Sequence, residues 1–116
     1  MKVREVYNLY EGIKELIDKE LSITTAFKIQ KNFTKLEDEV KQAEVIRKKI
    51  IDKYKEGEFE GNAKIKDDCI DKFNEEIEEL FNQDVELDLK EINISELENI
   101  KIKPITLSRL DLIIIE

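Results

Sequence analysis

The chain has 116 residues, which fits a single domain spanning residues 1–116. Charged residues make up 41% and hydrophobic residues also 41%, so the chain is too apolar for a disordered protein. The net charge of −8 disfavours direct binding of nucleic acid and of anionic membrane surfaces, since both would repel it.

Charge is distributed unevenly along the chain. Residues 1–56 carry 13 Lys/Arg and 11 Asp/Glu, a balance of +2, whereas residues 57–116 carry 7 and 17, a balance of −10. The acidic half has two interpretations: it imitates the charge of a nucleic acid, or it only keeps the protein soluble.

The first segment, residues 3–21, is predicted to be an amphipathic helix. Its apolar residues share one helical face: Val3, Val6, Leu9, Tyr10, Ile13, Leu16, Ile17 and Leu21. Gly12 lowers helix propensity, which suggests that another helix makes close contact there. The following "SITT" offers hydroxyl groups that can cap the next helix.

Residues 25–56 predict a second, long helix with a heptad stripe. The stripe consists of Ile29, Phe33, Leu36, Val40, Ala43, Arg47, Ile50 and Tyr54. A helix of roughly 45 Å is longer than a compact domain of this size is wide. We therefore expect part of the stripe to project and to bind a second copy, giving a homo-oligomer, or another protein. Arg47 interrupts the stripe, either to make a specific polar contact or to extend its head group into water.

Gly57, Gly61 and Asn62 predict a chain reversal, followed by a third helix over residues 67–83. Either Asp67 or Asp68 would cap this helix, which should pair antiparallel with the second as a helical hairpin. Phe59 lies within the reversal, where it either anchors a partner or folds back over the hairpin.

The last third of the chain (83–116) changes to a period of two. Residues 84–89 and 99–102 alternate apolar with charged residues and predict an antiparallel β ribbon. Residues 106–116 fit either a short helix or a buried strand, and we favour the helix. With residues 1–82 as the helical part, the sequence predicts a mainly α fold. The predicted fold consists of a long antiparallel helical hairpin and an N-terminal helix, with a small two-stranded β ribbon and a short C-terminal helix as additional elements.

The sequence offers little for catalysis. It has no histidine and one cysteine, Cys69, so a His-based metal site, a disulfide and a paired-Cys zinc site are excluded within one chain. Asp68, Asp71, Glu75 and Glu78 share a helical face that could bind a divalent ion, although such a run usually faces solvent. We expect no enzyme activity, cofactor or metal.

The order of the segments in this chain is distinctive, and its most specific parts are "FNEEIEELFNQDVEL" (73–87) and "ISELENIKI" (94–102). In these features, and over nearly the whole chain, the sequence resembles a family of small uncharacterised proteins encoded by phages and prophages of Gram-positive bacteria. The family provides no activity or site residues to transfer. The resemblance implies a phage-encoded accessory protein that acts in the bacterial cytoplasm.

The leading hypothesis is therefore a non-enzymatic interaction protein. It would bind itself, or a host or phage protein, through the heptad stripe and Phe59, with counteraction of host defence as one role. One alternative is an oligomer that sequesters a nucleotide signal of anti-phage defence, with positive charge from Lys28, Lys31, Lys35, Lys48 and Lys49. The other alternative is an acidic mimic of nucleic acid.

Overall fold

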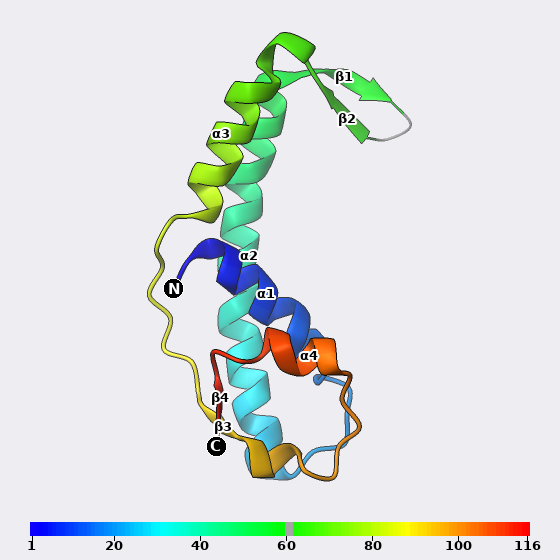
Figure 1. Ribbon diagram of the computed structural model, residues 1–116, viewed down its shortest axis with the longest axis vertical. Coiled ribbons are helices and arrows are strands. Elements are labelled where there is room, and N and C mark those ends of the chain that lie inside the picture. Colours follow the sequence, from blue (N-terminus) through cyan, green and yellow to red (C-terminus); the bar gives the residue numbers. More distant parts are fainter. Residues whose placement is uncertain (60–61) are drawn as a thin grey trace.

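A long central helix organises the molecule (Figure 1). A computed structural model describes the backbone of residues 1–59 and 62–116 and the side chains of residues 1–57 and 63–116. Its elements, in order, are α1 (Val3–Lys14), α2 (Ile23–Tyr54), β1 (Lys55–Phe59), β2 (Asn62–Ile65), the 3₁₀ turn η1 (Asp67–Cys69), α3 (Ile70–Phe81), β3 (Ile92–Asn93), the 3₁₀ turn η2 (Ile94–Leu97), α4 (Pro104–Arg109) and β4 (Ile114–Ile115).

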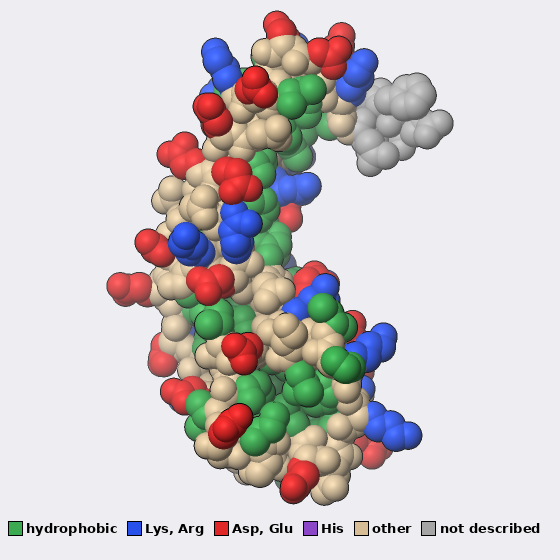
Figure 2. All heavy atoms as spheres, in the orientation of Figure 1, with side chains coloured by type: hydrophobic (Ala, Val, Ile, Leu, Met, Phe, Trp, Pro, Cys, Tyr) green, Lys and Arg blue, Asp and Glu red, His purple; other side chains and the backbone are tan. Residues whose placement is uncertain are grey.

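The predicted fold class is confirmed. The helix α2 is the spine; α1 crosses its N-terminal half, and α3 returns antiparallel along its C-terminal half (Figure 1). We call residues 41–81 the arm and the rest of the molecule the body. The radius of gyration is 17.2 Å and the longest dimension 51 Å, whereas a compact domain of this length has a radius of about 13 Å. The molecule is therefore elongated, with α2 extending beyond the body, and Figure 2 shows the outline hollowed beside α2.

The main core lies in the body. It joins α1 and the first half of α2 to the C-terminal third of the chain through Val6, Leu9, Ile13, Leu16, Ile29, Leu36, Ile92, Leu97, Leu110 and Ile113. Among the described residues, the arm contributes only Ala43, Ile50 and Leu80 to the buried apolar set, each 8–9% exposed. The arm therefore has fewer fully buried side chains than the body to stabilise it.

Gly12 has the close contact that its position predicted. A Cβ atom at this residue would lie 3.0 Å from the Cβ of Arg109 and 3.0 Å from the Cδ2 of Leu110, at the end of α4. Leu110 is fully buried, so it has little room to move away. Glycine at this position lets α1 and α4 pack closely, which offsets its low helix propensity.

The antiparallel ribbon forms at a different place from the one predicted. β1 pairs with β2 in the arm, at the expected chain reversal, with Lys55 opposite Ile65. The prediction of a ribbon between residues 84–89 and 99–102 is wrong. The alternation there reflects burial instead: Val85, Leu87 and Leu89 pack on the core while the acids between them face solvent.

Residues 83–91, which we call the strap, run along α2 from the end of α3 to β3 (Figure 1). At its start the strap pairs with the N-terminal residues, where the N–H of Val3 donates to the carbonyl of Gln83 and the N–H of Val85 to that of Met1. At its opposite end the strap leads into β3, which pairs in parallel with β4. The C-terminal segment, predicted as a short helix, therefore contains both the helix α4 and the short strand β4.

The helix boundaries differ modestly from those predicted. α1 ends at Lys14, and tighter hydrogen bonds such as Leu16 N–H to Ile13 O continue the turn. Ser22 caps α2 as expected, since its Oγ accepts from the N–H of Thr25. The predicted Asp cap of α3 is wrong, because η1 precedes the helix and Cys69 occupies the cap without a side-chain bond. No helix in the described residues is long and apolar enough to cross a membrane.

Candidate interaction surface

The heptad stripe is covered within the chain. Ile29, Leu36, Ala43 and Ile50 are buried, and Phe33, Val40 and Tyr54 are half-buried. In the body α1 covers the stripe, with Tyr10 stacked on Phe33 at 5.6 Å between ring centroids. In the arm α3 covers it, with Phe73 edge-on to Tyr54 at 6.4 Å. Within one chain, α1 and α3 therefore cover most of this stripe, which leaves less of it for an outside partner than the sequence suggested.

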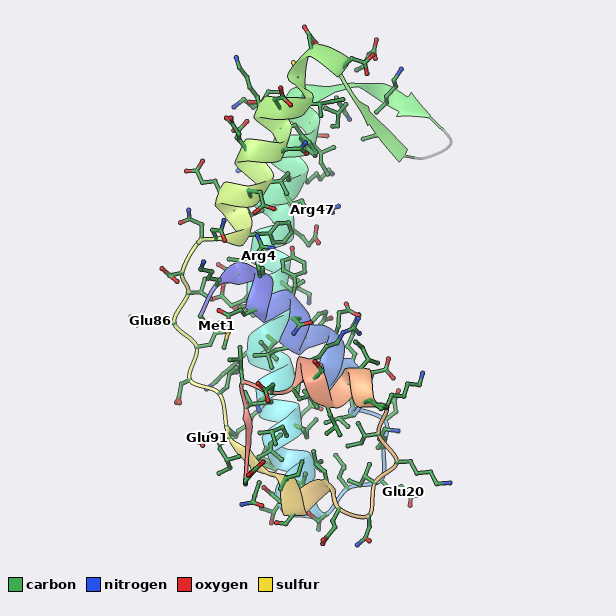
Figure 3. All side chains as sticks on the ribbon, viewed as in Figure 1. Met1, Arg4, Glu20, Arg47, Glu86 and Glu91 are labelled. Carbon is green, nitrogen blue, oxygen red and sulfur yellow. The ribbon has the colours of Figure 1, made fainter. Side chains whose placement is uncertain are left out.

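The other two residues predicted to take part in binding, Arg47 and Phe59, do not form an interaction surface with the stripe among the described residues. Arg47 is exposed on the part of α2 beyond α1 (Figure 3) and pairs with Glu44 of its own helix at 3.2 Å. This is a surface pair of small energetic value, which fits the interpretation of a solvated head group. The side chain of Phe59 lies outside the residues that the structure describes.

A different surface exposes large apolar side chains beside lysines. Phe27 is 62% exposed and Ile23 is 90% exposed, both on the outer side of the first turns of α2. Two adjoining open hollows, of about 490 and 480 Å³, meet at Phe27. Both hollows are lined by Phe27, Lys31 and Lys90; together with Ile23 and Lys28 from one hollow and Lys35 from the other, these residues make up what we call the Phe27 patch.

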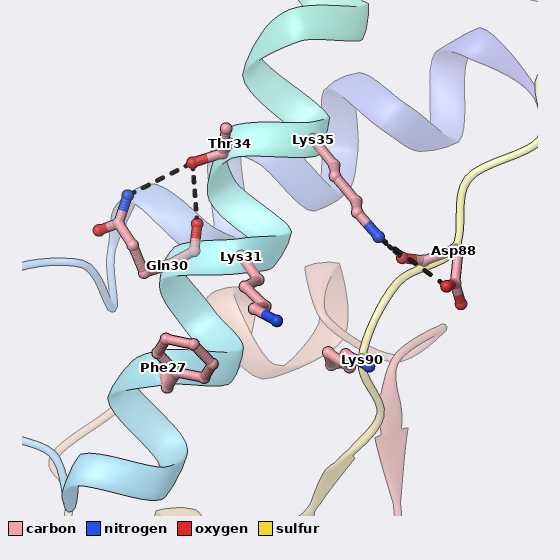
Figure 4. Close-up of a pocket in the computed structure, with 7 residues that line it drawn as sticks. All are labelled: Phe27, Gln30, Lys31, Thr34, Lys35, Asp88 and Lys90. Atoms are coloured by element: carbon pink, nitrogen blue, oxygen red, sulfur yellow. Dashed lines mark hydrogen bonds and ion pairs between the residues drawn. The ribbon is translucent and has the colours of Figure 1, made fainter.

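The patch is basic on an acidic protein. The ammonium of Lys31 lies 4.6 Å from the ring centroid of Phe27, a cation–π distance. Lys35 donates to the backbone carbonyl of Asp88, and its ammonium lies 3.9 Å from the Asp88 carboxylate (Figure 4). In the part of the chain that the structure describes, neither Lys31 nor Lys90 forms an ion pair, so both keep charge available for a partner.

Buried Asn32 brings Lys90 to the patch. Its side chain is 1% exposed; its Nδ2 donates to the carbonyl of Lys90 at 2.9 Å, and its Oδ1 accepts from the N–H of Lys90 at 2.7 Å. One amide thus satisfies both backbone groups of a single strap residue, much as a neighbouring strand would. This contact fixes the strap on α2 and places a fourth lysine beside Phe27.

Glu96 fixes Lys28 at the other side of the patch. Its carboxylate accepts from the Thr25 hydroxyl at 3.0 Å, from the Lys28 ammonium at 3.0 Å and from the N–H of Asn93 at 2.8 Å. The backbone N–H of Asn93 and the Lys28 ammonium lower the pKa of this carboxyl group below its ordinary value. The network joins η2 to the first turns of α2.

Protein-family models, curated proteins and solved structures were compared with the chain, and none matches.

Sequence reasoning found part of the patch. Lys28, Lys31 and Lys35 were singled out for their charge, and the structure brings them together; Lys48 and Lys49 lie further along α2, in the arm. It missed Phe27, which is not part of the heptad stripe. It also missed Lys90, because only the strap's return along α2 brings that residue to the patch. The sequence did contain a signal that Phe27 is exposed. Of the residues three or four positions away from it, only Ile23 is apolar, so Phe27 does not belong to a continuous apolar helical face.

The described residues show no arrangement for metal binding. No group of three or more His, Cys, Asp or Glu side chains in the described ranges could hold a metal ion. Of the four carboxylates predicted to share a helical face, Glu78 lies in the second half of α3 and pairs with Arg4 of α1 at 2.7 Å, which links the arm to the body.

A second link between arm and body involves Tyr7. Its ring packs edge-on against Phe81 of α3 at 5.3 Å, and its hydroxyl donates to Glu44 of α2 at 3.1 Å. Burial, followed by the hydrogen bond to Glu44, raises the pKa of Tyr7 to about 12. The phenol therefore stays protonated at neutral pH and acts as a hydrogen-bond donor between helices.

A groove in the arm has the opposite charge to the patch. It lies between α2 and α3, has a volume of about 260 Å³, and is lined by Ile46, Ile50, Glu76, Glu79, Leu80 and Gln83. We call it the arm groove. Its floor is apolar and its acidic residues lie on α3, where Glu76 holds Lys53 at 2.9 Å.

The Glu96 network makes stability depend on pH. Because the folded-state pKa is lowered, the stabilisation is complete above the ordinary value of 4.5 and is lost as pH falls through the lower folded value. We expect Glu96→Gln to reduce the free energy of unfolding by about 1–2 kcal/mol at pH 7, and by less at pH 3. Urea unfolding at both pH values measures this, with exposed Glu98→Gln as the control. A wild-type-to-variant difference that is the same at pH 7 and pH 3 would contradict the assignment.

Proposed function

We propose that the chain is a non-enzymatic binding protein that docks an acidic protein partner on the Phe27 patch. The observation that carries the proposal is the exposure of Phe27 and Ile23 among four lysines, on a chain whose net charge is −8. Large apolar side chains that remain exposed beside one another commonly mark a binding surface.

The two kinds of residue have different roles in this proposal. An aromatic side chain at the centre of an interface contributes most of the affinity once a partner excludes water from it. The lysines around it attract an acidic surface over long distances and reject basic ones, which raises the association rate and the specificity. Lys31 and Lys90 contribute most, since Lys28 and Lys35 already contact carboxylates of the chain.

The proposal includes the cellular setting that the resemblance implies. The protein would be a phage-encoded accessory protein in the bacterial cytoplasm, and its partner a host or phage protein. It would act by occupying that partner's surface, with inhibition of a host defence protein as one such role.

A second candidate function is the binding of a nucleotide signal at the same patch. The observation that favours it is the lysine cluster around an aromatic ring, because a base can stack on Phe27 while ammonium groups contact its phosphates. The hollows are open, however, whereas small-molecule sites usually enclose most of their ligand. This geometry favours the protein partner.

Affinity capture tests the proposal. Wild type, Phe27→Ala, the double variant Lys31→Glu with Lys90→Glu, and the control Leu112→Ala are immobilised and exposed to bacterial lysate at 50 and 300 mM salt. Leu112 is a matched control because it is also an exposed apolar residue, at the C-terminal side of α4. We expect acidic proteins to be retained by wild type and control, and at least tenfold less by both patch variants and at high salt.

The other outcomes separate the hypotheses. An identical set of retained proteins on wild type and both patch variants would overturn the proposal. Calorimetric titration with a cyclic dinucleotide and with ADP-ribose tests the second candidate, using the same variants. Binding by wild type that Phe27→Ala abolishes would replace the protein partner with a nucleotide ligand.

A further inference from the structure

The Phe27 patch and the arm groove are complementary in both charge and polarity. The patch presents an aromatic ring and an isoleucine surrounded by lysines. The groove presents Ile46, Ile50 and Leu80 beside the carboxylates of Glu76 and Glu79. Within the described residues, Glu79 forms no ion pair, and it is therefore available to a lysine of another molecule.

One molecule cannot bring these two surfaces together. Phe27 and Ile46 are 19 positions apart on the same continuous helix, which corresponds to about 28 Å at 1.5 Å per residue. A rigid helix keeps them at that separation. The complementary surfaces can therefore meet only between copies.

We propose that the acidic partner of the Phe27 patch includes a second copy of this chain, which presents its arm groove. The proposal rests on the function proposed above and names one partner of the same surface. Phe27 would enter the groove against Ile46 and Leu80, while Lys31 or Lys90 pairs with Glu79. Because the two surfaces differ, the contact is head-to-tail, and it builds a ring or a filament rather than a twofold dimer.

A net charge of −8 on each copy opposes this association at long range. At 150 mM salt the screening length is about 8 Å, so that repulsion falls off while contacts within the interface persist. The association should therefore be measured at this ionic strength.

Complementation between two half-disabled variants tests the proposal. Phe27→Glu disables the patch and leaves the groove intact, whereas Ile46→Glu disables the groove and leaves the patch intact. Leu112→Glu adds the same charge at an exposed site outside both surfaces. Sedimentation equilibrium at 150 mM salt measures the mass of each protein and of the equimolar mixture, and circular dichroism checks that each is folded.

We expect the mass of wild type and Leu112→Glu to rise with concentration above that of one 13.7 kDa chain. Each patch or groove variant alone should associate at least tenfold more weakly. Their mixture should form a dimer that does not grow further, because only one working patch and one working groove meet.

Two results would overturn the inference. One is a wild-type mass that stays at a single chain up to millimolar concentration. The other is a mixture that fails to form dimers although wild type associates, since that indicates a different interface. If self-association is absent while the patch still captures acidic proteins from lysate, the proposed function stands and only the second copy is excluded as a partner.

Discussion

The Leu36→Ala variant is expected to lose about 3–4 kcal/mol of the free energy of unfolding. Leu36 is fully buried where α2 meets the core that α1 and the C-terminal third complete. Removing its side chain loses the transfer free energy of the deleted atoms and leaves a cavity that neighbouring helices fill only partly. Urea unfolding followed by circular dichroism measures the change.

The matched control for this variant is Val45→Ala on the same helix. Val45 is 55% exposed, so its truncation should change stability by no more than about 0.5 kcal/mol. Equal losses from the two substitutions would show that the stripe residue is not packed as described. If Leu36→Ala lowered the free energy of unfolding only slightly, the heptad stripe would again be a candidate binding surface.

The second large effect is expected from Asn32→Ala. The substitution removes two hydrogen bonds to Lys90 and leaves a backbone N–H and carbonyl without partners against the side of α2. Orphaned groups of this kind cost about 1–3 kcal/mol each when water cannot reach them, so we expect a total loss of about 2–4 kcal/mol. Part of the strap should also become accessible to solvent.

Two measurements check this expectation. Urea unfolding gives the stability loss, and amide hydrogen exchange should show that the N–H of Lys90 loses its protection. Exposed Gln30→Ala, two residues away on α2, is the control and should change neither. Unchanged exchange at Lys90 in Asn32→Ala would mean that other contacts hold the strap.

The helical elements were predictable because their signals are local. The heptad spacing of α2, the face of α1 and the close approach at Gly12 all follow from which residues share a side of one helix. The strand prediction for residues 84–89 failed because alternation reports which side chains are buried, whereas a strand also needs a partner. The chain buries Val85 and Leu87 on the body, but among the described residues this segment pairs with the N-terminal residues only through the isolated bridge between Lys2 and Asp84.

The candidate surface was less predictable because it depends on contacts distant in sequence. The heptad pattern shows that one side of α2 is apolar, but it does not show whether the covering helix belongs to the same chain. In this molecule α1 and α3 supply the cover. The patch joins residues 23–35 to Lys90 of the strap, and the hydrogen bonds of buried Asn32 to Lys90 and of Lys35 to Asp88 set that register.

The core of the body can close only after the C-terminal third of the chain has been synthesised. The core against α1 and α2 is completed by Ile92, Leu97, Leu110 and Ile113, which a ribosome adds 56 to 77 residues after Leu36. At a synthesis rate of about 5–20 residues per second, the apolar faces of α1 and α2 remain uncovered for several seconds before the C-terminal residues that pack on them are synthesised. During that interval the exposed apolar side of the nascent helices is the surface most prone to aggregation.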